Sequence, residues 1–349
     1  MLFGGRSGEH VVSAMSGLAI IEGLKTRYDV VPIGITRSGQ FLPGADVRKA
    51  VSGGGVEKAG GAEIRSLAPL EISQVVGRLD VVIPALHGPM GEDGTIQGLL
   101  ELADIPYVGS GVLGSAVSMD KAVMKEVLEC SGLPTSPWFL VTETLWREDP
   151  GPFVQRGKAL SWPVFVKPAN MGSSVGIAKV ADEDAFERAV EKAFEYDRRV
   201  MVEKGLAARE FECAVLGNDH PETSVVGEIV PHADFYDYGA KYGEEGADLV
   251  IPAPLAPARS EEIRDLAQRA FLAVDAQGLA RVDFFLEGER VYVNEINTLP
   301  GFTPFSMYPK LWAATGVPYE QLLDRLIQLA LERHEIRRRK LDRGGRNLP

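Results

Sequence analysis

Residues 281–297, RVDFFLEGERVYVNEIN, contain two alternating apolar runs on either side of a short turn with a glycine. This pattern predicts a β-hairpin, because a half-buried strand alternates between apolar and polar side chains. The side chains expected to share a face are Arg281, Asp283 and Phe285 on the first strand, and Val293, Glu295 and Asn297 on the second.

The register of the hairpin decides which polar side chains meet. We expect Leu286 to pair with Arg290, which puts Arg281 opposite Glu295. Asp283 is then the diagonal neighbour of that glutamate on the same face. Carboxylates and an amide oxygen therefore converge beside an arginine.

This group of oxygens predicts a magnesium site. Carboxylates gather on a half-buried sheet only at a large free-energy cost unless a cation holds them. Asp283, Glu295 and Asn297 offer hard oxygen donors of the kind that Mg²⁺ prefers, and Mg²⁺ usually keeps coordination positions for phosphate oxygens. The alternative is a salt-bridged surface hairpin that binds no ligand.

A loop rich in Pro and Gly, residues 298–306, follows the hairpin. Gly301 has no side chain, so its backbone N–H can approach a substrate closely. Preorganised N–H groups of this kind stabilise an oxyanion.

The composition indicates a globular protein of two or three domains. The chain has 349 residues, of which 45% are hydrophobic and 25% charged. Its net charge of −12 disfavours nucleic acid or an anionic membrane as a partner. No segment is apolar enough to span a membrane and no signal peptide precedes the first glycine loop, so we expect a cytoplasmic protein. Cys130 and Cys213 lie in apolar segments and are expected to be buried thiols.

The N-terminal segment, which ends at Ser110, predicts an α/β domain. A Gly-rich turn at residues 4–8 leads into a helix with Glu9 at its start, where the carboxylate can complement the helix dipole or hold a ligand ammonium. The apolar run 81–86 is typical of a buried parallel strand and ends at His87. Ligands of open α/β sheets bind beyond such strand ends, so His87 is a candidate site residue; a plain loop histidine is the alternative.

Two lysines are placed where phosphate would explain them. Ser118 is expected to cap a helix over 119–131, and Lys121 in its first turn opposes the helix dipole. Lys167 lies on a predicted strand, and a Gly/Ser loop at 170–177 follows it. Such a loop offers N–H groups and hydroxyls to phosphate, although a flexible hairpin tip is the alternative and no P-loop is present.

The remaining segments predict a strand ending in Glu203 and Lys204, a hinge at 207–209 and a long aromatic loop at 232–251 that suits a lid. A final helix is expected over 318–333, followed by a frayed basic tail. Together the parts form a nucleoside triphosphate site without a P-loop. No Cys/His or Ser/His nucleophile pattern is visible, and a reaction driven by ATP through an acyl phosphate would need none.

In these segments the chain resembles the D-alanine–D-alanine ligases of the ATP-grasp superfamily. The segments that carry the resemblance are residues 4–9 with 12–13, 87–94, 119–121, 166–168, 172–176, 235–238 with 241–242, and 294–301. The glycine-rich segments alone are weak signals, but the whole set in this order is highly specific and covers nearly the whole chain.

The resemblance implies an α/β fold, α+β in the ATP-binding part, in a three-domain ATP-grasp architecture with an N-terminal parallel sheet. The expected divisions are an N-terminal α/β substrate domain at 1–110, a central ATP-grasp domain at 111–209, a C-terminal ATP-grasp and metal domain at 210–335, and a basic tail at 336–349. It implies ATP-dependent ligation of two D-alanines for peptidoglycan precursor synthesis.

The resemblance also assigns site residues. Those expected at the substrates and the reacting atoms are Glu9, His87, Ser173, Tyr242, Arg281, Gly301 and Ser306. Those expected at ATP are Lys121, Lys167, Gly172, Ser174, Glu203, Lys204, Leu206, Glu210, Tyr236 and Lys241. Two Mg²⁺ ions, with Mn²⁺ as a substitute, would be held by Asp283, Glu295 and Asn297.

Two alternatives stay open. A D-alanine:D-lactate ligase or another ATP-grasp carboxylate-amine ligase would share the metal face and the lysines. A nucleotide-binding regulator without catalysis would typically have lost a metal ligand or Arg281. The expected partners are D-alanine and ATP, with a homodimer implied by the resemblance.

Overall fold

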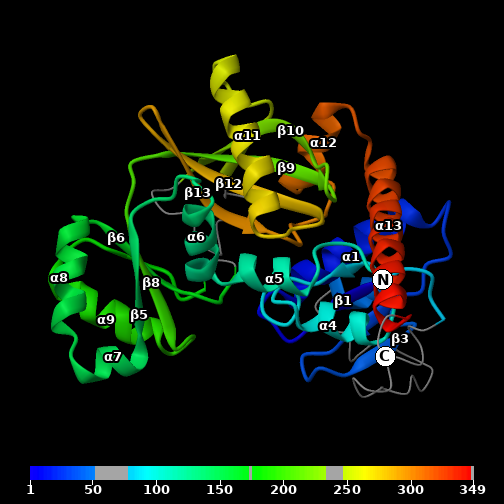
Figure 1. The fold of residues 1–349 in the computed structure, drawn as a ribbon, viewed down its shortest axis with the longest axis horizontal. Coiled ribbons are helices and arrows are strands. Elements are labelled where there is room, and N and C mark those ends of the chain that lie inside the picture. Colours follow the sequence, from blue (N-terminus) through cyan, green and yellow to red (C-terminus); the bar gives the residue numbers. More distant parts are fainter. Residues whose placement is uncertain (52–77, 173–174, 233–246, 347–349) are drawn as a thin grey trace.

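The computed structural model describes residues 1–51, 78–172, 175–232 and 247–346. Within them the chain forms three β-sheets with helices packed on them (Figure 1). No helix among the described residues is long and apolar enough to cross a membrane.

The N-terminal sheet has four short strands in the order β3-β2-β1-β4. Strand β1 pairs in parallel with β2 and β4, as predicted, whereas β2 and β3 pair antiparallel. The elements are β1 (Leu2–Gly4), α1 (His10–Leu24), β2 (Ile33–Ile35), β3 (Phe41–Pro43), α2 (Val47–Lys49), β4 (Pro84–Ala85) and α4 (Thr95–Leu102). The carboxyl ends of β1 and β4 lead into the loops that carry Glu9 and His87.

Two consecutive helices, α5 (Val112–Met119) and α6 (Lys121–Cys130), replace the single predicted helix. The predicted cap at Ser118 is wrong: Asp120 caps α6, and its carboxylate accepts from the backbone N–H groups of Ala122 and Val123. Because Ser118 lies inside α5, its hydroxyl comes too early in the chain to cap α6. Cys130 is exposed at the end of α6, contrary to the prediction, whereas Cys213 is buried.

The middle sheet is antiparallel, in the order β5-β8-β6-β7. Its core joins one face of the sheet to three helices, which Figure 1 shows together with it in one lobe. The elements are β5 (Trp138–Thr142), α7 (Glu143–Glu148), α8 (Gly151–Leu160), β6 (Val164–Pro168), β7 (Ala178–Val180), α9 (Glu183–Ala193) and β8 (Arg199–Lys204). Asp182 caps α9 as predicted, accepting from the N–H of Ala185.

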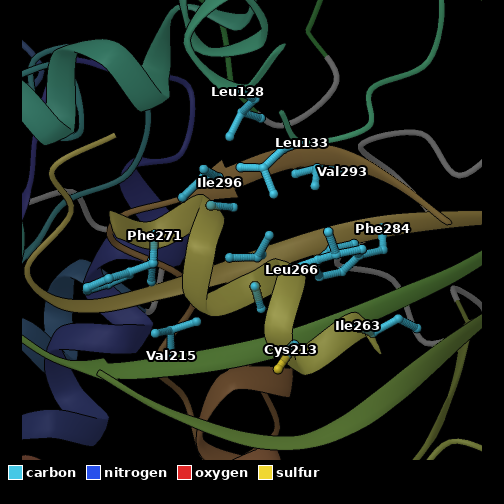
Figure 2. Close-up of a cluster of buried hydrophobic side chains, with 14 of the residues drawn as sticks. Leu128, Leu133, Cys213, Val215, Ile263, Leu266, Phe271, Phe284, Val293 and Ile296 are labelled. Carbon is cyan, nitrogen blue, oxygen red and sulfur yellow. The ribbon is translucent and has the colours of Figure 1, made fainter. Parts of the chain in front are cut away.

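The C-terminal sheet has the order β11-β10-β9-β12-β13. Its elements are β9 (Arg209–Gly217), β10 (Glu222–Pro231), β11 (Ala247–Val250), α11 (Pro257–Ala273), β12 (Gly278–Glu287), β13 (Arg290–Asn297), α12 (Met307–Thr315) and α13 (Tyr319–Arg346). Residues 247–250 of the predicted irregular lid therefore form strand β11. Figure 2 shows one core of this sheet, in which Phe271 and Leu266 of α11 face Phe284 and Ile296 of the hairpin.

Helix α13 differs from the prediction because it continues to Arg346, where a frayed tail was expected. It lies beside the N-terminal part of the chain (Figure 1). Arg333 donates to the carbonyl of Tyr107 at 2.9 Å, and Arg337 forms an ion pair with Glu101 at 2.9 Å. These contacts bind basic side chains of the helix to the N-terminal part of the chain. The helix therefore continues beyond the predicted end at residue 333. The predicted domain boundaries themselves stay a prediction.

The predicted hairpin is present, but its register is not the expected one: Leu286 pairs with Val291 and not with Arg290, and Arg281 lies opposite Asn297 and not opposite Glu295. Asp283 pairs with Glu295 and Phe284 pairs with Val293, so Asn294 is an extra residue in β13. This β-bulge reverses the alternation of faces. Val293 therefore lies in the core, while Glu295 lies beside Asp283 on the opposite face.

Candidate active site

A cavity of about 860 Å³ is lined by loops of the N-terminal part of the chain and by residues of the middle and C-terminal sheets. It is lined by every predicted site residue that the structure describes: Glu9, His87, Lys121, Lys167, Gly172, Glu203, Lys204, Leu206, Glu210, Arg281, Asp283, Glu295, Asn297, Gly301 and Ser306. Ser173, Ser174, Tyr236, Lys241 and Tyr242 lie outside the described residues. The cavity thus gathers groups from the N-terminal loops and from the middle and C-terminal parts of the chain, from Glu9 near its start to Ser306 near its end.

Three carboxylates form one wall of the cavity. Glu212 on β9, Asp283 on β12 and Glu295 on β13 are in register, so they lie side by side across three adjacent strands. Arg281 donates to both oxygens of Asp283 at 2.7 Å and lies 3.0 Å from an oxygen of Glu212. Burial alone would lower the pKa of Arg281, but Asp283 and Glu212 raise it well above its usual value.

The oxygen atoms on this wall are of the chemical type that a hard divalent cation prefers. Asp283, Glu295, Asn297 and Glu212 supply carboxylate and amide oxygens. No group of three or more acidic, histidine or cysteine side chains is arranged to hold a metal in the described ranges. Here Arg281 holds Asp283, and the amide nitrogen of Asn297 also donates to that carboxylate at 3.0 Å.

A buried ion-pair network forms another part of the lining, to which Lys167 and Glu203 contribute. Lys167 Nζ lies 2.5 Å from one carboxylate oxygen of Glu203, and Lys125 Nζ lies 2.6 Å from the other. Lys125 is fully buried and also donates to Ser136 at 2.9 Å. Burial opposes ionisation of Glu203, yet the two lysines lower its pKa well below the usual value. The cations of this network are therefore fixed by a shared anion.

The Glu9 carboxylate lies between two glycines. A Cβ added to Gly88 would come within 2.7 Å of Glu9 Oε2, and one added to Gly172 within 3.1 Å. Gly88 also has a positive φ of 71°, which disfavours any other residue. Next to Gly172, Lys121 Nζ donates to the carbonyl of Met171 at 2.6 Å. The predicted phosphate loop therefore starts beside both an anion and a cation of the cavity.

His87 is buried and contacts the loop that follows the hairpin. Its Nδ1 lies 3.0 Å from the carbonyl oxygen of Leu299, and its Nε2 lies 3.2 Å from Ser16 Oγ. Burial lowers the pKa of His87, although nearby Glu9 acts in the opposite direction. The ring is therefore neutral at physiological pH.

Glu92 lies near His87 and accepts from the N–H of Gly88 at 2.6 Å. Burial, and then the charge of Glu9, raise its pKa to about 8. Gly301 and Ser306 are neighbours, since a Cβ on Gly301 would lie 3.0 Å from Ser306 Oγ. That hydroxyl accepts from the N–H of Thr303 at 3.1 Å.

Four of these residues were not predicted as site residues: Ser16, Glu92, Lys125 and Glu212. Lys125 stands one helical turn after Lys121 and so lies on the same side of α6, which is a signal that the sequence offers. Glu212 stands two positions after Glu210 on one strand, which is another. Ser16 carries no local signal, because its partners are His87 and Phe302.

Known proteins of one family match this chain over nearly its whole length. The family model described as the D-ala D-ala ligase N-terminus matches residues 1–110, and the corresponding C-terminus model matches residues 127–328. A D-alanine–D-alanine ligase of Bacillus velezensis is 47% identical over 344 residues, covering 95% of this chain and 97% of its own. One from Thermoanaerobacter pseudethanolicus is 49% identical over 346 residues, covering 96% of each chain.

Solved structures agree. The D-alanine–D-alanine ligase from Coxiella burnetii is 36% identical with a TM-score of 0.84, covering 98% of this chain and 95% of its own. The VanG D-Ala:D-Ser ligase from Enterococcus faecalis is 34% identical with a TM-score of 0.83, covering 94% of this chain and 98% of its own.

Proposed function

The chain belongs to the D-alanine–D-alanine ligase family, and we propose that it joins two D-alanine molecules at the expense of ATP. The product, D-alanyl-D-alanine, is a precursor of peptidoglycan, which links the enzyme to cell-wall synthesis and cell shape. The observation that carries this proposal is the single cavity lined by all described residues expected at ATP, at the metal and at the substrates.

At the nucleotide end, Lys121 and Lys167 contact the phosphates of ATP. Lysines placed there neutralise the charge that develops in phosphoryl transfer. Lys204, Leu206 and Glu210 hold the adenosine, and the segment from Gly172 to Gly176 covers the phosphates.

At the substrate end, Glu9 holds the ammonium group of the first D-alanine. Glu9 is buried beside Gly88 and Gly172, and the absence of side chains at both glycines leaves room for a small ammonium group next to its carboxylate. The carboxylate of this D-alanine attacks the γ-phosphate of ATP and forms an acyl phosphate, with ADP leaving. The amine of the second D-alanine then attacks the acyl carbon, and phosphate leaves.

Arg281 and the N–H of Gly301 stabilise the oxyanion of that second step, and Ser306 receives the carboxylate of the second D-alanine. A fixed cation and a fixed dipole lower the barrier because they need no reorganisation as charge develops. Closure of the cavity matters as well, since water would hydrolyse the acyl phosphate.

Asp283, Glu295 and Asn297 are the residues that would hold two Mg²⁺ ions, or Mn²⁺ in their place. When bound, such ions neutralise phosphate charge and orient the phosphates of ATP. We expect Arg281, which here contacts Asp283 and Glu212, to contact the reacting carboxyl group as well.

Phosphate release from ATP and Mg²⁺ tests the function. Release that requires D-alanine and yields the dipeptide supports the proposal, and L-alanine serves as the control. Strong stimulation only when D-lactate or D-serine joins D-alanine would identify a different second substrate. No stimulation with ATP still bound would favour the regulator.

The expected location is the cytoplasm, where ATP is supplied, and the expected assembly is a homodimer. Sedimentation of the purified chain at several concentrations would test the assembly.

A further inference from the structure

The loop Leu299–Phe302, which carries Gly301, is held at both ends by side chains from other parts of the chain. Leu299 and Phe302 are both buried. The carbonyl of Leu299 accepts from His87, and the N–H of Phe302 donates to Ser16 Oγ at 3.4 Å. Both partners belong to the N-terminal part of the chain, so the contacts join segments that are distant in sequence.

These contacts form one directed chain of hydrogen bonds. Phe302 N–H donates to Ser16 Oγ, Ser16 O–H donates to His87 Nε2, and His87 Nδ1–H donates to the carbonyl of Leu299. The Leu299 carbonyl can only accept, so His87 Nδ1 carries a proton, and in the neutral ring Nε2 is then left to accept from Ser16. Burial, which lowers the pKa of His87, favours the same neutral ring.

The other side of Leu299 is held as well. Glu92 accepts a hydrogen bond from the backbone of Leu299 and another, at 2.6 Å, from that of Gly88. On the far side of the loop, Tyr319 O–H donates to the carbonyl of Phe302 at 2.8 Å. The backbone groups of Leu299 and Phe302 that flank Gly301 are thus bonded to four side chains.

We infer that Ser16, His87 and Glu92 are positioning residues whose hydrogen bonds to Leu299 and Phe302 set the orientation of the Gly301 N–H. The inference rests on the proposed function for the role of Gly301, but the hydrogen-bond chain itself does not depend on it. Both ring nitrogens of His87 are used in this series of hydrogen bonds. We therefore assign His87 the role of orienting the loop and not that of transferring a proton in the reaction. Side chains of the N-terminal part of the chain are therefore coupled to the loop Leu299–Phe302 through hydrogen bonds to its backbone.

The first test measures the hydrogen-bond chain directly and needs no activity. In protein labelled with ¹⁵N-histidine, His87 should show a protonated Nδ1 and an unprotonated Nε2 at neutral pH. In Ser16→Ala, the Nε2 resonance should shift, and hydrogen exchange of the peptide over 298–306 should become at least tenfold faster. Ser131→Ala, an exposed serine at the end of α6, is the matched control and should change neither signal. A protonated Nε2, or unchanged exchange in Ser16→Ala, would overturn the inference.

The second test separates positioning from general stability. Ser16→Ala and Glu92→Ala should each lower kcat for dipeptide formation about 10- to 100-fold while the KM for ATP stays within twofold, since misplacement of a catalytic group has effects of this size. Glu92→Gln keeps an acceptor oxygen and should recover most of kcat. Tyr319→Phe removes only the bond to the Phe302 carbonyl and should lower kcat less. Equal losses in kcat for Glu92→Gln and Glu92→Ala, or a matching rise in the KM for ATP, would overturn it. If the wild type forms no dipeptide while its His87 signals match, the proposed function fails and the hydrogen-bond chain stands.

Discussion

Replacement of Lys125 by methionine tests the buried ion-pair network. Lys125 is fully buried, and its Nζ contacts Glu203 and Ser136 at 2.6 and 2.9 Å. Methionine has a similar volume and flexibility, so the substitution removes the charge and leaves little cavity. Among the described residues, Lys167 is then the cation that remains paired with Glu203.

The expected loss in the free energy of unfolding follows from this geometry. Removal of one partner from a buried pair destabilises by about 3–5 kcal/mol, because the remaining charge stays buried. We expect the lower end, about 3 kcal/mol, since Lys167 stays 2.5 Å from Glu203. The pKa of Glu203 is lowered in the folded state, so this stability is present above the unfolded value near pH 4 and is lost as the pH falls. The difference between the two proteins should therefore narrow below about pH 4.

Urea titration followed by tryptophan fluorescence measures the loss. Lys158→Met is the matched control, because Lys158 pairs with Glu183 at 2.7 Å with side chains 38% and 47% exposed. An exposed pair contributes less than about 1 kcal/mol. If Lys125→Met loses no more than Lys158→Met, the argument that Lys125 keeps Glu203 ionised is refuted.

Three further predictions follow from the cavity. Glu295→Gln should abolish ATP turnover while the circular dichroism spectrum stays that of the wild type, and retained turnover would contradict the assignment of Glu295 as a metal ligand. Gly172→Ala places a methyl group about 3.1 Å from Glu9 Oε2. In steady-state assays the KM for the first D-alanine should therefore rise about tenfold, which corresponds to about 1.4 kcal/mol. An unchanged KM would argue against Glu9 as the ammonium site. The pKa of Glu92 is raised to about 8 in the folded protein. Its contribution to stability is therefore present below the unfolded pKa near 4 and is lost as the pH rises through about 8. Thermal melting between these pH values should show this loss of stability in the wild type but not in Glu92→Gln.

Much of the candidate site could be predicted from the sequence because its residues stand in short local patterns. The alternation in residues 281–297 predicted the hairpin, and the run before His87 predicted a strand end at the ligand side of the sheet. Each pattern lies within one short segment, so the order of residues along the chain alone determines which side chains are adjacent. The family resemblance supplied the roles that these patterns alone left open.

The register of the hairpin was not predictable in this way. One extra residue, Asn294, moves Val293 into the core and keeps Glu295 beside Asp283. A bulge costs little locally, and the sequence period of two gives no sign of it. The packing of Val293 against the core of the sheet stabilises the bulged register.

The sequence by itself determined which residue types the site contains: the carboxylates of residues 283 and 295, the two lysines and the glycine loops. Only the tertiary structure decided which of them meet. Lys125 reaches Glu203 and Ser16 reaches Phe302, and both contacts are buried although the partners are distant in sequence. The physical reason is that a buried polar group must find a partner, while the identity of that partner depends on how distant segments pack.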